Sequence, residues 1–311
     1  MTVRFGLVLA AALAGFAGTG RAQPIADDLH GRLRVVSMSS ERVADVSERN
    51  DLGRLQIVAA NPGLDPFEPQ TRAQIVLPTA HLLPDGPREG LVVNRGDYRL
   101  YYFVSGELAF TAPVGLGHRA HETPLGKTTV VRKAKDPTWY PTENARDDFP
   151  ELSAVIPPGP DNPLGTRALY LGWPTYLIHG AVDSYAIGRR FTRGCIRLYS
   201  ADIERLFEMV PVGTPVEIVD QPVKMGWHGG ELFLEAHPSF EQLEELRVKA
   251  TLTATDADYL NPLIKSRAGG RAPDIEWSLV AETLAARRGL PVQITSPKTH
   301  PVNIMADGTG Y

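Results

Sequence analysis

The stretch Phe191-Thr192-Arg193-Gly194-Cys195-Ile196-Arg197-Leu198 contains the only cysteine of a 311-residue chain. The cysteine follows His179, in Tyr176-Leu177-Ile178-His179-Gly180, by sixteen residues. A single thiol cannot form an intramolecular disulfide, so an exported chain needs another reason to keep it, and a nucleophile beside an imidazole is such a reason. A buried structural cysteine is the alternative, because free cysteine is among the most buried residue types. The glycines next to both residues and the histidine itself favour the nucleophile.

The pairing of Cys195 with His179 has a clear chemical rationale. A thiolate attacks a carbonyl carbon, whereas a thiol does not, so the cysteine needs a neighbour that accepts its proton near neutral pH. A neutral imidazole can accept that proton and later return it to a leaving amine. His179 follows an apolar β-type run and Cys195 follows a glycine, so we expect both to project from adjacent strand ends into one cleft. Strand alternation places Arg197 on the same face as Cys195.

The residues around this pair predict a mainly β unit over residues 88–222, a sandwich or barrel-like sheet. Short β-type runs are broken by Gly, Pro, Asn or Asp. The expected strands are residues 91–93, 98–103, 107–110, 128–131, 168–171, 176–178 and 215–219. The one clear helix spans residues 200–209, with Ile203, Leu206 and Phe207 on one face.

The motif His179-Gly180 followed by Thr192-Arg193-Gly194-Cys195-Ile196-Arg197-Leu198 resembles the signature of L,D-transpeptidases with a YkuD-type catalytic domain. The resemblance extends to an ErfK/YbiS-like branch over residues 30–238. It is carried by the segments Val114-Gly-Leu-Gly117, Glu122-Thr-Pro-Leu-Gly-Lys127, Pro137-Thr-Trp139-Tyr-Pro-Thr142, Pro157 to Gly165, Asp202 to Phe207 and Pro222-Val-Lys224.

The resemblance implies a cysteine acyltransferase that needs no cofactor and acts on peptidoglycan stem peptides and glycan. Cys195 would attack the amide between the L-centre of meso-diaminopimelate and the terminal D-alanine of a tetrapeptide, leaving a thioester that an acceptor amine resolves. His179 would be the general base and acid, oriented by the main-chain carbonyl of Gly180, with the Asp183 carboxylate as a side-chain alternative. Backbone amides around Gly194 and Cys195 would meet the oxyanion.

The remaining site residues are expected to bind substrate. Arg197 could hold a substrate carboxylate in a bidentate pair, or could be an exposed ion-pair partner. Tyr176, Trp139 and Thr192 are expected cleft walls or hydrogen-bond donors, although aromatic residues on strands are often only core. The family commonly has Ser-His-Gly-Cys where this chain has Thr192-Arg193-Gly194-Cys195, and we expect the charge of Arg193 to favour the thiolate. Ala181-Val182 also replaces the usual Thr-Asn.

Residues 30–80 predict a small βααβ module. We expect a strand over 34–38, helices over 41–50 and 55–61, and a strand over 73–77. The turn Asn50-Asp51-Leu52-Gly53, the segment Ala60-Asn61-Pro62-Gly63 and the closing Ile75-Val76-Leu77-Pro78 make it resemble LysM, a glycan-binding module. A structural module without a ligand is the alternative.

The two ends of the chain differ in what they predict. Residues 1–22 have a single Arg4, an apolar run over residues 5–16 and small residues up to Ala22, as in a cleaved secretory signal peptide. An uncleaved anchor is the alternative, although the run is short for a bilayer and no later segment predicts a transmembrane helix. With the resemblance, this implies a periplasmic protein. Residues 223–311 predict a partly helical extension, with helices over 240–250 and 273–288 and no recognisable chemistry.

Composition and the remaining motifs exclude other classes. The chain has 32 Lys+Arg against 36 Asp+Glu, whereas a general nucleic-acid binder needs a basic face. His118-Arg-Ala-His121-Glu122 does not have the spacing of a zinc hydrolase, so we expect no metal. A non-catalytic peptidoglycan-binding protein remains an alternative. Three acceptors stay open: a second stem giving a 3-3 crosslink, a lysine of a lipoprotein or outer-membrane protein, or water, which gives a carboxypeptidase or amidase.

Overall fold

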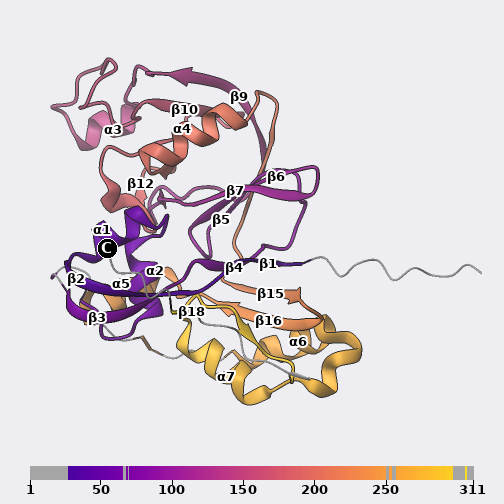
Figure 1. Ribbon diagram of the computed structural model, residues 1–311. Helices are drawn as coiled ribbons and strands as arrows, with labels where there is room; N and C mark the ends of the chain where they lie inside the picture. Colours follow the sequence, from indigo (N-terminus) through magenta and orange to yellow (C-terminus); the bar gives the residue numbers. More distant parts are fainter. Residues whose placement is uncertain are drawn as a thin grey trace, which may run out of the picture.

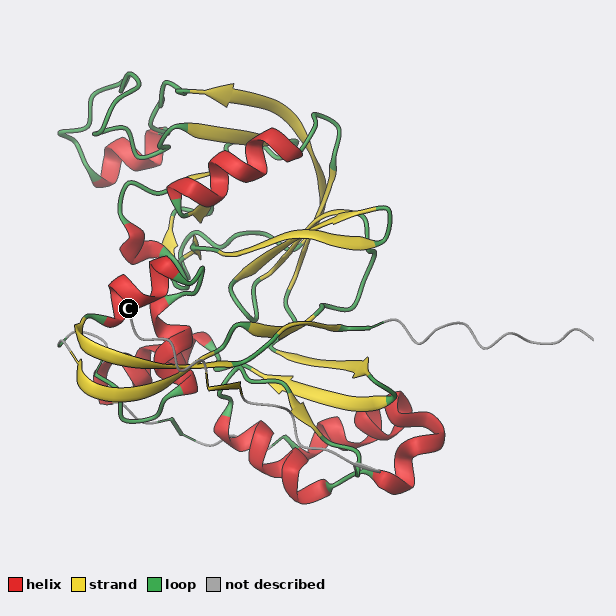
Figure 2. Ribbon diagram, in the orientation of Figure 1, coloured by secondary structure: helices red, strands yellow, loops and turns green. Residues whose placement is uncertain are grey.

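The computed structural model of the chain describes residues 27–65, 68, 70–249, 252–253, 257–296 and 305–306 (Figure 1). The predicted signal peptide, residues 1–22, lies outside these ranges. None of the helices in the described ranges is long and apolar enough to cross a membrane. The described chain forms three regions that lie against one another, a βααβ module, a central sheet and a C-terminal unit (Figure 2).

The N-terminal module has the predicted order of two strands and two helices. Its elements are β2 (Arg34–Glu41), α1 (Val43–Arg49), α2 (Arg54–Ala60) and β3 (Gln70–Leu77), with β2 and β3 antiparallel. Apolar side chains of both helices, including Val43, Val46 and Leu55, are buried against this pair. The amide group of Asn61 donates to the carbonyls of Ile57 (2.8 Å) and Val76 (2.7 Å). Asn61 therefore ties the end of α2 to β3.

The central region is a mixed eight-stranded sheet in the order β13-β11-β10-β9-β14-β5-β6-β7, which confirms the predicted mainly β fold. The strands are β5 (Gly90–Asn94), β6 (Arg99–Val104), β7 (Glu107–Pro113), β9 (Gly126–Lys135), β10 (Arg167–Leu171), β11 (Leu177–Gly180), β13 (Ile196–Leu198) and β14 (Pro215–Val219). Just past β7, Gly115 exchanges two backbone hydrogen bonds with Arg197 of β13 (2.8 and 2.9 Å). Because this contact joins the two ends of the strand order, the sheet almost closes into a barrel.

Two helices accompany the sheet, although the sequence predicted one. α4 (Ser200–Met209) is the predicted helix, and it buries Ile203, Leu206 and Phe207 in the sheet's core. α3 (Glu143–Asp148) was not predicted, and it lies at the outer end of the molecule (Figure 1). The smaller elements of the chain are β1 (Leu29–Gly31), β4 (Ala80–Leu82), β8 (Leu116–Gly117), β12 (Arg190–Thr192), β18 (Met305–Ala306) and the 3-10 turns 184–186, 258–260 and 269–274.

The C-terminal unit is partly helical, as predicted, and it also contains a small sheet. β15 (Val223–His228), β16 (Glu231–Ala236) and β17 (Val292–Gln293) form an antiparallel sheet that the sequence reading missed. α5 (Phe240–Lys249) matches the first predicted helix, while α7 (Trp277–Ala286) is shorter than the predicted 273–288 because residues 269–274 form a 3-10 turn. α6 (Asn261–Ala268) was also missed. The unit has its own apolar core, which includes Leu232, Ile264 and Val280.

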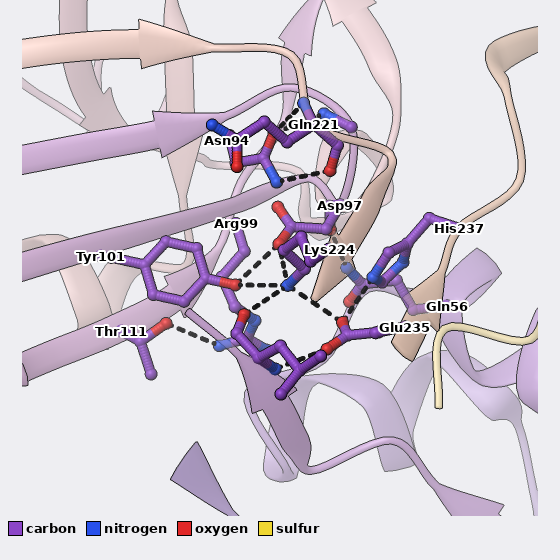
Figure 3. A network of polar contacts seen from close by, with 12 residues as sticks. Gln56, Asn94, Asp97, Arg99, Tyr101, Thr111, Gln221, Lys224, Glu235 and His237 are labelled. Atoms are coloured by element: carbon purple, nitrogen blue, oxygen red, sulfur yellow. Dashed lines mark hydrogen bonds and ion pairs between the residues drawn. The ribbon is translucent and has the colours of Figure 1, made fainter. Parts of the chain in front are cut away.

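A buried charge network joins this unit to the rest of the protein (Figure 3). The ammonium group of Lys224, on β15, lies 2.7 Å from the carboxylate of Asp97 and 3.0 Å from that of Glu235. It also donates to the Leu82 carbonyl (2.7 Å) and to the Tyr101 hydroxyl (3.1 Å). The four residues that contact the Lys224 ammonium group are all buried. They belong to β4, the central sheet and β16. One lysine therefore connects the C-terminal unit to β4 and to the central sheet.

Candidate active site

Cys195 and His179 are brought together by two neighbouring parallel strands. In the register of β11 and β13, Ile178 is opposite Ile196 and His179 is opposite Arg197, so Cys195 directly precedes β13 beside Leu177. Both side chains line one cleft of about 1640 Å³. The expectation that the cysteine and the histidine face one cleft from adjacent strand ends agrees with this arrangement. The same cleft is lined by the other predicted substrate-binding residues, which are Trp139, Tyr176, Thr192, Arg193 and Arg197.

The imidazole of His179 is buried and held in one tautomer. Its Nδ1 lies 2.7 Å from the carbonyl oxygen of Gly180, and the residue is 2% exposed. A carbonyl only accepts hydrogen bonds, so Nδ1 carries the proton and Nε2 is left as an acceptor. Burial, with a smaller effect of the Arg197 charge, lowers the pKa of His179 to about 3, so the ring is neutral at physiological pH. Asp183 accepts instead from the backbone N–H of Tyr185 (2.8 Å).

The thiol of Cys195 is also uncharged in the free protein. Burial raises the pKa of this thiol, while a backbone hydrogen bond from Leu177 and the charge of Arg197 lower it by smaller amounts. The thiol lies 3.5 Å from the carbonyl oxygen of Thr175. The free site therefore holds a neutral thiol and a neutral imidazole. Attack on a carbonyl requires the thiol proton to move to the imidazole.

Arg193 contacts α3 rather than the thiol. Its guanidinium forms an ion pair with the Asp148 carboxylate and donates to the Asn144 carbonyl (2.9 Å). The guanidinium that lowers the pKa of the Cys195 thiol is that of Arg197. The expectation that Arg193 favours the thiolate is therefore not met, because a carboxylate neutralises its charge. Arg193 instead connects the nucleophile loop to the segment that covers the cleft.

The turn before the cysteine requires glycine at position 194. Gly194 has a φ of +104°, and a Cβ there would lie 2.7 Å from Cε1 of Tyr176. The Tyr176 ring packs edge-on against Trp173, with ring centroids 6.1 Å apart. The hydroxyl of Thr192 donates to the Cys195 carbonyl (2.5 Å) and accepts from the Gly194 N–H (3.2 Å). Tyr176 is thus a wall against the turn, and Thr192 shapes the turn from within.

Arg197 and Trp139 both line the cleft. Ile196 and Leu198 are buried on the other face of β13, so strand alternation leaves Arg197 on the cleft side, with its Nε buried and without a hydrogen-bond partner. Trp139 is half-buried and exchanges backbone hydrogen bonds with Ile156 (2.9 Å each). Both residues are therefore placed to contact a molecule in the cleft.

Sequence reasoning assigned no role to Thr123 and did not name Trp173. Thr123 is buried, and its hydroxyl donates to the Gly194 carbonyl (2.8 Å). The available signal was its position in Glu122-Thr-Pro-Leu-Gly, a segment that carries part of the family resemblance. Trp173 lines the cleft beside Tyr176, and no local pattern distinguishes it from a core aromatic residue.

Among the described residues, the ionisable side chains of His118, His121 and Glu122, which line the cleft, do not form a metal site. His118 and His121 face each other with ring centroids 5.1 Å apart, and Glu122 is paired with Arg95 (3.1 Å) and Arg190 (3.0 Å). Within the described residues, the group with metal-ligand spacing is Asp97, Glu235 and His237, whose ligand atoms lie within 4.8 Å of one another. The ammonium of Lys224 contacts both of its carboxylates, so this group already holds a cation.

The amino-acid sequence of the chain is similar to those of known proteins. Residues 88–218 match the family model of the YkuD L,D-transpeptidase catalytic domain. The chain is 37% identical to a probable L,D-transpeptidase ErfK/SrfK of Salmonella typhimurium over 85% of its own length and 86% of the relative's. It is 34% identical to the Escherichia coli probable L,D-transpeptidases YbiS (94% and 100% of the two lengths) and YcfS (96% and 94%).

Proposed function

The chain belongs to the L,D-transpeptidase family, and we propose that it acts on peptidoglycan stem peptides through a thioester on Cys195. The observation that carries the proposal is the placement of Cys195 and His179 on neighbouring parallel strands in one cleft, with the imidazole fixed by the Gly180 carbonyl. A neutral imidazole with its proton on Nδ1 is the form that accepts a thiol proton at Nε2. The site needs no cofactor for this chemistry.

The proposed reaction has two halves. In the first, the Cys195 sulfur attacks the carbonyl carbon of the amide between diaminopimelate and the terminal D-alanine, while the thiol proton passes to His179. The imidazolium returns that proton to the leaving nitrogen, D-alanine departs, and a thioester remains. In the second, an acceptor amine attacks the thioester carbonyl and transfers a proton to His179, and the imidazolium returns that proton to the departing sulfur, which leaves as the thiol.

Charge and shape of the cleft support a peptide substrate. Arg197 lies on the cleft side with an unpartnered Nε, and its guanidinium is suited to a carboxylate of the stem. Thr192, Tyr176 and Trp139 line the same space. Its volume of about 1640 Å³ exceeds the roughly 300–1,000 Å³ of a site for one small molecule, which leaves room for two peptides.

We favour an amine acceptor over water. A second stem peptide would give a 3-3 crosslink, and a lysine of an envelope lipoprotein or outer-membrane protein would give protein attachment. Mass spectrometry of muropeptides from cells that lack and cells that overproduce the protein distinguishes these products from the tripeptides that hydrolysis leaves. An increase of tripeptides alone on overproduction would show that the hydrolytic alternative is correct.

Acylation by a carbapenem tests the catalytic half directly. We expect the wild-type protein to gain the mass of one carbapenem and the Cys195→Ala variant to gain none. The Cys195→Ser variant keeps the shape of the site but loses the thiol, so we expect no stable adduct there either. A wild-type protein that folds and never forms an adduct would favour the non-catalytic binding role.

The N-terminal residues add a location and a binding module to the proposal. We propose that residues 1–22 direct export to the periplasm and that residues 30–80 form a LysM-like module that binds peptidoglycan glycan. The βααβ order of β2, α1, α2 and β3 supports this resemblance. Sedimentation of the catalytically dead Cys195→Ala protein with purified peptidoglycan tests it, and a protein that stays in the supernatant would favour a purely structural module.

A further inference from the structure

A buried hydroxyl from outside the nucleophile turn, that of Thr123, holds this turn. Thr123 is 2% exposed, and its Oγ1 lies 2.8 Å from the carbonyl oxygen of Gly194 and 3.0 Å from the backbone nitrogen of Gly117. The Gly117 N–H donates to this oxygen, so the hydroxyl proton is free to point at the Gly194 carbonyl. The hydroxyl of Thr123 therefore fixes the direction of the peptide bond that precedes Cys195.

That direction determines where the Cys195 amide points. The described chain contains no cis peptide bond, and in a trans peptide the C=O and N–H point to opposite sides. Because the Gly194 carbonyl points inward to buried Thr123, the Cys195 N–H points away from Thr123, and Cys195 itself lines the cleft. The Gly194 N–H is engaged by the Thr192 hydroxyl at 3.2 Å. Of these two amides, the one of Cys195 is the available donor.

Thr123 is itself held by a well-anchored loop. Its carbonyl accepts a hydrogen bond of 2.8 Å from Arg95, whose side chain is 9% exposed. Arg95 belongs to the loop after β5, which Asn94 fastens to Gln221 and Asp97 fastens to Lys224 (Figure 3). Buried contacts therefore fix the position of the Thr123 hydroxyl behind the nucleophile.

We infer that Thr123 is a positioning residue that aims the Cys195 backbone N–H at the oxyanion formed during acylation. The inference rests on the proposed acyl-transfer function. Loss of one oxyanion-hole donor costs roughly 10²–10³ in rate, so loss of the residue that aims it is expected to cost about 10–10². Thr123 does not touch the substrate, and its effect passes through the Gly194 carbonyl.

The test compares two reactions of the same sulfur in the Thr123→Val and Thr123→Ser variants. Acylation by a carbapenem forms an oxyanion, whereas alkylation by iodoacetamide needs the thiolate and forms none. We expect Thr123→Val to slow acylation by about 10–10² while alkylation stays within about twofold at every pH, and Thr123→Ser to restore acylation to within a few-fold. Thr214→Val is the matched control, because buried Thr214 donates to the Pro211 carbonyl at the same 2.8 Å away from the cleft.

Other outcomes would contradict either the role of Thr123 or the proposed function. Equal acylation in Thr123→Val and wild type, equal slowing of acylation and alkylation, or failure of Thr123→Ser to rescue would each overturn the inference. If Thr123→Val does not fold, Thr123→Ala is expected to give the same split, and failure of both to fold would make Thr123 merely structural. Absence of acylation in the wild-type protein would instead refute the proposed function, and alkylation would still report whether the thiol is intact.

Discussion

The nucleophile turn and the segment that covers the cleft are built in opposite ways. In the turn, Thr192 and Gly194 are buried, and Thr123 supports them with a buried hydroxyl. The covering segment, residues 137–164, which we name the flap, exposes large apolar side chains: Tyr140 is 68%, Phe149 49% and Val155 49% exposed. Arg193 connects the two regions through its contacts with α3.

The two regions have different tasks in the site. A misplacement of about 1 Å can cost 10²-fold in rate, so the atoms that react need a closely packed surround. Segments with few buried apolar contacts open at low free-energy cost, and such segments are suited to admit bulky substrates. We therefore expect substitutions in the turn to act on the chemical step and substitutions in the flap to act on substrate entry.

The largest effect is expected from Gly194→Ala. The new Cβ would meet the Tyr176 ring at 2.7 Å in a residue with a φ of +104°, so we expect acylation to fall by about 10² or more and stability by about 2–4 kcal/mol. Gly213→Ala is the control, since Gly213 has a φ of +93° with no atom within 4 Å. We expect it to cost about 1 kcal/mol and to leave acylation unchanged. Equal losses in the two variants would remove the claim that packing in the turn matters.

The next effect is a loss of stability in acid, and it comes from His179, which lies beside the nucleophile turn. The pKa of His179 is about 3 in the folded protein against 6.5 for the free side chain. Between pH 6.5 and 3 the unfolded chain binds a proton at this imidazole and the folded chain does not. The contribution of His179 to the free energy of unfolding is therefore complete above pH 6.5 and is lost progressively as the pH falls toward 3. One such group contributes a slope of up to about 1.4 kcal/mol per pH unit.

Chemical denaturation at several pH values measures this slope. Between pH 6.5 and 3, we expect the slope of the unfolding free energy against pH to decrease in His179→Gln by the amount that corresponds to about one proton. We expect the slope of Cys195→Ala to equal that of the wild type. Buried His81, whose pKa burial also lowers, contributes in the same direction in both variants. An unchanged slope in His179→Gln would mean that the imidazole titrates equally in the folded and unfolded chains.

A smaller effect is expected where the two regions meet. Asp148→Asn removes the ion-pair partner of Arg193. The side chain of Asp148 is 54% exposed and that of Arg193 is 29% exposed, so we expect stability to change by less than about 1 kcal/mol. Steady-state kinetics with a tetrapeptide donor should show KM altered by about two- to fivefold with kcat retained. Asp147→Asn, one residue earlier on α3, is the control. A fall in kcat without a change in KM would place the flap in the chemical step.

The smallest effect is expected inside the flap. Thr142 is the N-cap of α3, and its hydroxyl accepts from the Ala145 N–H (3.3 Å). We expect Thr142→Ala to cost about 0.5–1 kcal/mol of local stability and to speed proteolytic cleavage within the flap by about threefold, with the global unfolding midpoint unchanged. Thr138→Ala, which removes a flap threonine away from this cap, should not speed cleavage. Cleavage that begins elsewhere in the chain would contradict the division between the two regions.

The nucleophile turn was largely predictable from the sequence, because short-range rules govern it. Strand alternation placed Cys195 and Arg197 on one face, and a glycine before the cysteine predicted the tight turn. The contact between His179 and the Gly180 carbonyl followed from the family resemblance alone. The role of Thr123 could not be predicted, since its partner Gly194 is distant in sequence and only the folded sheet brings them together.

Some of the missed elements did carry local signals. Thr142 followed by Glu143 has the residue preferences of a helix start, yet α3 is only six residues long and its apolar pattern is weak. The hairpin of β15 and β16 turns at Gly229-Gly230, both with positive φ, which is a recognised two-residue hairpin pattern. By contrast, the neutralisation of Arg193 depends on where the flap folds, and no local pattern encodes that.

The position of Lys224 affects any attempt to divide the protein. If the chain were cut after residue 218, where the match to the catalytic family ends, the carboxylate of Asp97 would remain beside the Tyr101 hydroxyl with no cation to balance it. Removing one partner of a buried ion pair costs about 3–5 kcal/mol, a large share of the stability of an ordinary domain. A shortened protein that fails to fold would then say nothing about catalysis. Swapping of catalytic units between relatives should accordingly carry β15 and β16 along with the sheet.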